Sequence, residues 1–229
     1  MEKAILKTLI YADIFDYPLK FYEIHKWLIG KKIDLRQAEK ALKKLLQKGL
    51  IENTSGYYFL PGRKGLARKR KIRTEASGKF FFKVKIIAQV LQIIPQIKLV
   101  GISGGLAMEN AYKKDDIDLI LITAKNRMWL TRLLVCGLLD IIRVRRTVKM
   151  TNSQVSGKLC VNILIEEDSL EQTNKDIYLA HEILQMRPLW SRNGIYNKYL
   201  QDNDWVFKFI PNWIGPQIKK TKSFTFNQF

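Results

Sequence analysis

One stretch in the middle of the chain limits most strongly what this sequence can fold into. Two apolar runs, 97–102 and 117–122, flank the turn Ser103-Gly104-Gly105 and a short segment that is compatible with a helix. Apolar runs of this length that are separated by glycines are typical of buried strands. The pattern therefore predicts a strand, a glycine turn, a short helix and a second strand, in that order.

Two acids, Asp116 and Asp118, stand at the start of the second run. Side chains alternate along a strand, so these two point to the same side. A pair of carboxylates can anchor Mg²⁺, which fills its other positions with water and substrate phosphates. A glycine turn lets phosphate approach the backbone and accept from its N–H groups. The alternative is a solvated sheet edge that binds nothing.

These residues resemble the signature of the nucleotidyltransferase superfamily, a glycine turn followed by Asp-hydrophobic-Asp. The matching residues are Gly104-Gly105 and Asp116-Ile117-Asp118-Leu119, and flanking elements extend the resemblance over 97–187. The resemblance implies an α+β domain with a small mixed sheet flanked by helices. It also implies Mg²⁺-dependent transfer of a nucleoside monophosphate from a nucleoside triphosphate. Asp116 and Asp118 would bind the metal and catalyse, and Ser103, Gly104 and Gly105 would bind the nucleotide.

The sequence departs from this family at two positions. Active members usually carry a third acid on the neighbouring strand, and the matching polar residue in the run 158–165 is Asn162. An amide can orient a ligand or water but takes up no proton near neutral pH. Gly105 also replaces the serine that often follows the first glycine. Two hypotheses therefore stay open: an enzyme with an unknown acceptor, or a catalytically impaired protein of this fold that binds nucleic acid or regulates.

The first 60 residues predict three helices followed by a hairpin. Helical periodicity occurs at 3–14, at 19–29 and in a third segment that Asp34 caps, and the hairpin is expected at 50–60. This order resembles a winged helix-turn-helix, whose third helix enters the major groove of DNA. The side of the third helix that we expect to face solvent carries Arg36, Lys40, Lys43 and Lys44 as candidate contacts to DNA or RNA. Such modules also dock proteins, so that interpretation stays open.

Charge points to the same class of partner. The chain has 40 Lys and Arg against 21 Asp and Glu, a net charge of +19, which favours nucleic acid first and acidic membrane surfaces second. Positive residues are densest after Pro61, in a predicted long helix that includes Arg68 and Arg70. That helix could lie along a phosphate backbone, neutralise a triphosphate or serve as a solvated linker.

Four regions follow from these patterns: a winged-helix-like domain at 1–62, a basic helical connector at 63–95, a nucleotidyltransferase-like domain at 96–187, and an aromatic-rich helical cap and tail at 188–229. In the third region, 126–142 is expected to form a core helix and 174–186 another helix. His181 on the latter is a candidate for lining a cleft, although a lone histidine on such a helix usually packs structurally.

The remaining features concern the cell compartment. Neither of the two cysteines, Cys136 and Cys160, sits in a metal-ligand pair, and both are expected to be reduced, buried thiols of a cytoplasmic protein. The N-terminal residues show no apolar signal region, and the longest apolar stretch is too short to span a bilayer. We therefore expect no membrane insertion.

Overall fold

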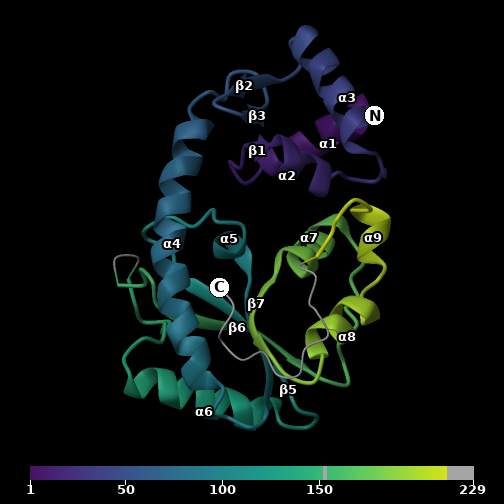
Figure 1. Cartoon of the computed structure of the whole chain (residues 1–229). Helices are drawn as coiled ribbons and strands as arrows, with labels where there is room; N and C mark the ends of the chain where they lie inside the picture. Colours follow the sequence, from purple (N-terminus) through teal and green to yellow (C-terminus); the bar gives the residue numbers. More distant parts are fainter. Residues whose placement is uncertain (152–153, 216–229) are drawn as a thin grey trace. The chain divides into compact units, whose positions relative to one another are not determined.

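The computed structural model describes residues 1–151 and 154–215 and places them in two compact units. The first comprises Met1–Ile72, Asn174–Leu184 and a stretch that begins at Trp205, and the second comprises Arg73–Thr173 and Gln185–Asp204. Helices are mixed with two small sheets, so the expected α+β class is confirmed (Figure 1). Residues 216–229 of the expected cap and tail lie outside the described residues.

The first unit is built from short helices around a three-stranded sheet. Its elements are α1 (Glu2–Asp13), β1 (Leu19–Lys20), α2 (Phe21–Lys26), α3 (Leu35–Gln47), β2 (Glu52–Thr54), β3 (Tyr57–Phe59), most of α7 (Ile177–Gln185), and α9 (Val206–Phe209). The expected start of α3 is confirmed: Asp34 Oδ1 accepts from the Gln37 N–H at 2.7 Å, and Gln37 Oε1 accepts from the Asp34 N–H at 3.2 Å. These reciprocal bonds satisfy backbone donors that no helical carbonyl can reach.

The expected helix at 19–29 is wrong at its start. Leu19 and Lys20 form β1, which pairs with β3 through Leu19–Tyr58 and Lys20–Tyr57, and only Phe21–Lys26 is α-helical. The pairing partner lies far along the sequence, so local helical periodicity could not reveal it. The hairpin of β2 and β3 was expected, and β1 completes its sheet.

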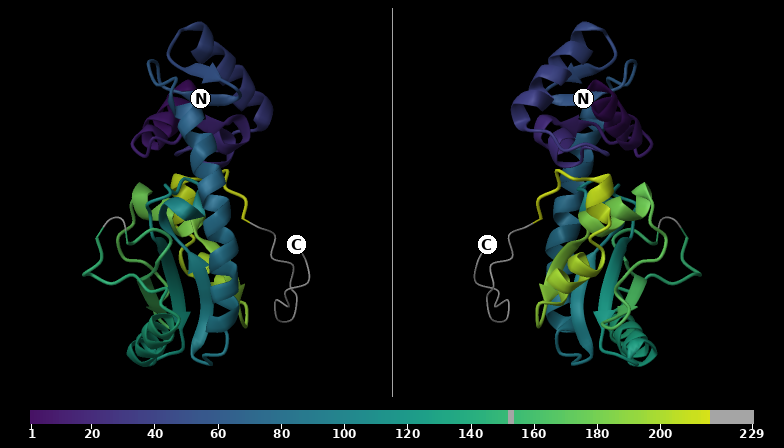
Figure 2. Two further views of the ribbon diagram at one scale, coloured as in Figure 1. Left: turned by 90° about the vertical axis from the view of Figure 1, so that its left-hand side faces the viewer. Right: turned by 90° about the vertical axis from the view of Figure 1, so that its right-hand side faces the viewer.

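The second unit is a four-stranded sheet with helices. Its elements are most of α4 (Leu66–Leu91), β4 (Ile97–Ile102), α5 (Gly104–Ala107), β5 (Ile117–Thr123), α6 (Met128–Ile141), β6 (Leu159–Glu166), β7 (Arg187–Ser191) and α8 (Ile195–Asp202). The strand order is β6-β5-β4-β7; β5 and β6 are parallel and the other pairs antiparallel, which confirms the expected mixed sheet. Figure 2 turns the ribbon by 90° to either side, so the path from α4 through β4 and β5 to α6 can be followed by colour.

The central strand β5 shows which side of the sheet carries Asp118. Ile117, Leu119 and Leu121 belong to the buried apolar cluster, together with residues of α4 and α6. Because side chains alternate along a strand, Asp118 points to the opposite side of the sheet. Asp118 therefore faces away from the cluster that contains Ile117, Leu119 and Leu121.

β7 is a strand that the sequence did not reveal. It occupies part of the stretch expected to be a helical cap, and it pairs with β4 at the sheet edge. Pro188 has no N–H to donate, which an edge strand tolerates and which hides the strand pattern. Opposite it, Gly101 is required for packing, because a Cβ there would lie 2.9 Å from Met186 Sδ and 3.2 Å from the Arg187 carbonyl oxygen.

The expectation of a core helix at 126–142 is only half right. Thr131, Val135 and Leu139 of α6 are buried, but Trp129 and Leu133 are exposed. The helix is apolar almost all round, so periodicity could not tell its inner side from its outer side. Among residues 1–151 and 154–215, no helix combines the length and apolar character needed to cross a membrane.

Candidate metal centre

The two acids lie where the loop before β5 enters the sheet. Backbone bonds hold this point: the Gly157 N–H donates to the Asp115 carbonyl at 2.8 Å, and the Ile117 N–H donates to the Lys158 carbonyl at 2.8 Å. Asp116 precedes β5 and Asp118 is its second residue, both half-buried. The loop before β6 therefore holds the backbone on both sides of Asp116.

The structure adds a third residue that the sequence did not single out for this site. Asp118 pairs in register with Cys160 on β6, whereas the neighbouring Leu159 and Val161 belong to the buried core. One ligand atom from each of Asp116, Asp118 and Cys160 lies within 4.8 Å of the other two. This Asp-Cys cluster could hold a metal ion. Only the parallel register of β5 and β6, which local sequence does not encode, brings the thiol there.

The glycine turn lies directly against the cluster. The Ser103 N–H donates to the Asp118 carbonyl at 3.0 Å, and Gly104 has a φ of +63°. A Cβ on Gly104 would lie 3.1 Å from Asp118 Oδ2, whereas one on Gly105 would meet nothing closer than 3.6 Å. Gly104 is therefore needed both for its backbone conformation and for the close approach of the carboxylate.

Ser103 contributes an unsatisfied polar atom at this turn. The residue is 3% exposed, and its Oγ is buried without a hydrogen-bond partner among the described residues. A buried hydroxyl without a partner costs free energy in the folded protein. A ligand, an ion or a water molecule at the turn would supply the missing hydrogen-bond partner.

One cation already lies against the carboxylates. The Arg146 Nη1 atom lies 2.6 Å from Asp116 Oδ2. Its backbone is positioned by β6, because the Arg146 N–H donates to the Leu159 carbonyl at 2.8 Å. Burial, assisted by the charge of Asp116, raises the pKa of Asp118 to about 6, and Arg146 partly opposes that rise. Burial likewise raises the pKa of the Cys160 thiol, with the charges of both carboxylates acting in the same direction.

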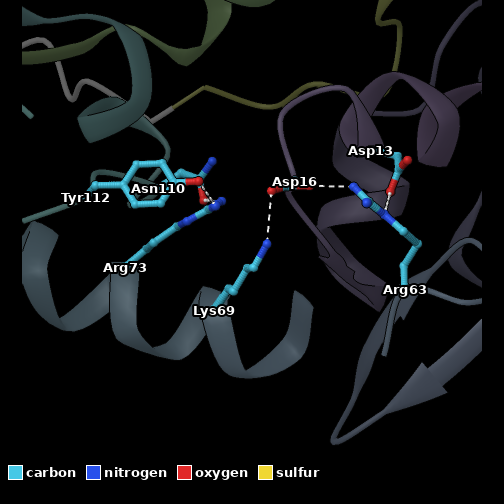
Figure 3. A network of polar contacts seen from close by, with 7 residues as sticks. All are labelled: Asp13, Asp16, Arg63, Lys69, Arg73, Asn110 and Tyr112. Carbon is cyan, nitrogen blue, oxygen red and sulfur yellow. Dashed lines mark hydrogen bonds and ion pairs between the residues drawn. The ribbon is translucent and has the colours of Figure 1, made fainter. Parts of the chain in front are cut away.

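The loop that leads to the acids is anchored on α4 (Figure 3). Arg73 is 2% exposed; its Nη1 donates to Asn110 Oδ1 at 3.0 Å, and its Nη2 donates to the Tyr112 hydroxyl. Ser77 Oγ accepts from the Ala111 N–H at 3.2 Å. α4 thus holds the segment between the glycine turn and Asp116 in place.

The predicted residue Asn162 lies apart from this register pair. It is exposed on β6 at the point where the pairing with β5 shifts, two residues beyond Cys160. The strand position opposite Asp118 thus belongs to a thiol and not to the amide.

The candidate nucleic-acid residues fall into two groups. Arg36, Lys40, Lys43 and Lys44 are exposed on α3, and Arg68 is exposed on α4. Lys43 makes a 2.8 Å ion pair with Glu39.

Arg70 differs from that exposed set. It is 4% exposed, donates to Glu23 Oε1 at 2.9 Å and stacks 3.7 Å from the centre of the Tyr17 ring. Its guanidinium is therefore turned into the first unit and away from a polyanion. Figure 3 shows the ion pairs of Arg63 with Asp13 and Asp16, which belong to the same unit as Arg70.

His181 also lies in the first unit and packs structurally. Its ring stacks on Tyr11 and Trp27, with centroid distances of 4.3 and 5.2 Å. The residue is 7% exposed, and burial lowers its pKa to about 4.

Comparisons with known proteins give little beyond this geometry. No protein-family profile matches the sequence, and no curated protein matches it. A crystal structure of a toxin-antitoxin with AMP-PNP is similar over 51% of this chain and 82% of that one, with 16% identity and a TM-score of 0.27. A likeness this weak carries no argument about function.

Proposed function

We propose that this protein binds a nucleoside triphosphate with a divalent cation at the Asp-Cys cluster and transfers the nucleoside monophosphate to an acceptor. One observation carries the proposal: ligand atoms from β6 and from the start of β5 converge within 4.8 Å, beside a turn whose Gly104 lies directly against the Asp118 carboxylate. Two carboxylates suit a divalent cation, and a glycine turn suits a polyphosphate.

The roles follow from what each group can donate or accept. Asp116 and Asp118 hold the cation, which when bound neutralises charge on the triphosphate. The Ser103 hydroxyl has no hydrogen-bond partner within residues 1–151 and 154–215, and it receives phosphate oxygens together with the backbone of Gly104 and Gly105. Asn162, exposed on β6, orients a ligand or water in this proposal.

The test is incorporation of each of four labelled nucleoside triphosphates, with cell extract as the source of acceptor and with Mg²⁺, Mn²⁺, Co²⁺ or Zn²⁺. We expect label transfer by the native chain and transfer reduced on the order of a thousandfold in Asp118→Asn. Asp168→Asn is the matched control, because Asp168 pairs with Lys125 at 3.2 Å and lies outside the cluster. Absence of transfer with every triphosphate and metal, from protein shown to be folded, would refute the enzyme.

The second candidate is a nucleic-acid-binding or regulatory protein that has this fold without catalysis. The exposed cations of α3 favour it, and in this proposal residues 1–62 act as a winged-helix module followed by the basic connector at 63–95. Each phosphate contact adds to the salt dependence of binding. Lys40→Glu with Lys44→Glu should weaken binding to duplex DNA or RNA and flatten its salt slope, whereas Lys208→Glu on α9 should not.

A further inference from the structure

The donor set of the Asp-Cys cluster does not match Mg²⁺. Mg²⁺ takes oxygen ligands in a near-octahedral arrangement, whereas thiolates suit Zn²⁺ and other thiophilic ions. We propose that Cys160 is a metal ligand and makes the cluster select an ion such as Zn²⁺ or Co²⁺ over Mg²⁺. This inference rests on the site of the proposed function and specifies the ion that works there.

The fold presents this sulfur to the carboxylates. Parallel pairing sets Cys160 opposite Asp118, and its strand neighbours Leu159 and Val161 turn into the core. The side chain between them therefore faces the side of the sheet that carries Asp118. Its sulfur lies within 4.8 Å of a ligand oxygen from each acid. Two ligands of one zinc ion lie at most about 4.5 Å apart, the sum of a Zn–S and a Zn–O bond, so binding draws these side chains slightly closer together.

Cys136, the other cysteine, is a thiol with a packing role. Cys136 is half-buried like Cys160, but it lies on α6 and packs against the apolar core cluster. It belongs to no group of metal-ligating side chains among the described residues. The two thiols are thus matched in exposure and differ in their surroundings, which makes Cys136 the control for any effect of removing a sulfhydryl group.

Binding needs only a local change. Arg146 neutralises Asp116 across 2.6 Å, but its side chain is 45% exposed, so the guanidinium can move into water when a cation arrives. The thiol gives its proton to solvent as the sulfur binds the metal, because the thiolate is the form that coordinates. Arg146 is exposed and Cys160 is half-buried, so neither step involves a fully buried side chain.

The direct test is a titration of the full chain with Co²⁺ alone. We expect a thiolate-to-cobalt charge-transfer band in the near ultraviolet for the native chain and for Cys136→Ser, and none for Cys160→Ser. Zn²⁺ should abolish the band at stoichiometric amounts, and Mg²⁺ in large excess should leave it. A band that is missing in the native chain, or that survives in Cys160→Ser, would overturn the proposal, as would its loss in Cys136→Ser.

A second variant keeps the test independent of lost folding. Cys160→Asp supplies the oxygen ligand that Mg²⁺ prefers, so it should raise Mg²⁺ affinity by about tenfold or more while the charge-transfer band disappears. Circular dichroism confirms that each variant is folded. If folded Cys160→Asp binds Mg²⁺ no better than the native chain, Cys160 is not a ligand position.

Label transfer measured on the same samples separates this inference from the proposed function. A cobalt band without transfer under any condition keeps the selective metal site and removes the transferase. Transfer that Mg²⁺ supports as well as Zn²⁺, unchanged in Cys160→Ser, keeps the transferase and removes the selectivity. Transfer that Zn²⁺ or Co²⁺ supports and Cys160→Ser loses, with Cys136→Ser unaffected, supports both.

Discussion

His181 and Asp118 both have strongly displaced pKa values, but for different reasons. His181, in the first unit, lies between the rings of Tyr11 and Trp27, and burial alone lowers its pKa to about 4. Asp118, in the second unit, has a pKa raised to about 6 by burial together with the charge of Asp116, against the opposing charge of Arg146. A displaced pKa is therefore common to a packed core and to a candidate site.

The two residues differ in the groups that surround them. Desolvation by apolar neighbours marks packing, whereas charges that converge from separate chain segments on a half-buried group mark a site where a ligand can bind. The histidine should therefore serve stability and the aspartate function. Each of the following measurements tests that division.

Asp118→Asn should give the largest effect on function. Loss of a ligand oxygen should reduce label transfer on the order of a thousandfold, about 4 kcal/mol of transition-state stabilisation. The folded-state pKa of Asp118 lies above its usual 3.8, so its ionisation reduces stability as pH rises through about 6. The neutral variant without metal should therefore melt at a higher temperature than the native chain at pH 8.

Thermal unfolding with and without Zn²⁺ checks the second half of that prediction. Metal should raise the melting temperature of the native chain and of Asp168→Asn, but not of Asp118→Asn, because only a bound ion stabilises the folded state. If Asp118→Asn without metal melts at a lower temperature than the native chain, Asp118 contributes to stability, as His181 does.

His181→Phe should change the pH dependence of stability and leave metal binding intact. In the folded chain the His181 pKa is about 4 against a usual value of 6.5, so the unfolded chain binds the extra proton between these pH values. Stability is therefore full above about pH 6.5 and falls by about 3 kcal/mol as pH drops toward 4.

Urea unfolding between pH 4.5 and 7.5 measures that slope. Phenylalanine keeps a ring between Tyr11 and Trp27 without a group to protonate, so the variant should lose most of the slope. His25→Gln is the control for removing an imidazole elsewhere in the same unit. An unchanged slope in His181→Phe would mean that other groups set the acid sensitivity.

Gly104→Ala should cost about 1–2 kcal/mol, because a left-handed backbone disfavours a side chain. It should also weaken metal binding, since the new Cβ would lie 3.1 Å from Asp118 Oδ2. Gly137→Ala is the matched control: that glycine lies in α6 with nothing within 4 Å of the added carbon, so alanine should stabilise by about 0.5–1 kcal/mol. Equal effects at both positions would disprove a special role for the turn.

Local patterns predicted the parts of this molecule that local chemistry determines. The apolar runs gave β4 and nearly all of β5, and Asp34 gave the start of α3. The paired acids were found in the same way, because their spacing of two is a property of the strand itself.

The rest depends on pairings between distant segments. Cys160 reaches Asp118 only through the parallel register of two strands, and Leu19 forms a strand only because Tyr58 lies beside it. The burial of Arg70 against Tyr17 is of the same kind. Charge and periodicity along the sequence carry no information on such contacts. Cys160 could therefore not be predicted as part of the site.

Arg146→Gln gives the smallest expected effect and tests how the charges at the site are balanced. Arg146 lies 2.6 Å from Asp116 and competes with an incoming cation, so its removal should tighten Co²⁺ binding by up to about tenfold, or about 1.4 kcal/mol. Calorimetry at two salt concentrations measures the gain, which should shrink as salt screens the arginine. Arg145→Gln, which loses an ion pair to Asp140 outside the cluster, should leave the affinity unchanged. Weaker binding of Co²⁺ by Arg146→Gln would instead mean that the arginine orients Asp116 for the metal. Arg146 would then assist metal binding and would not compete with it.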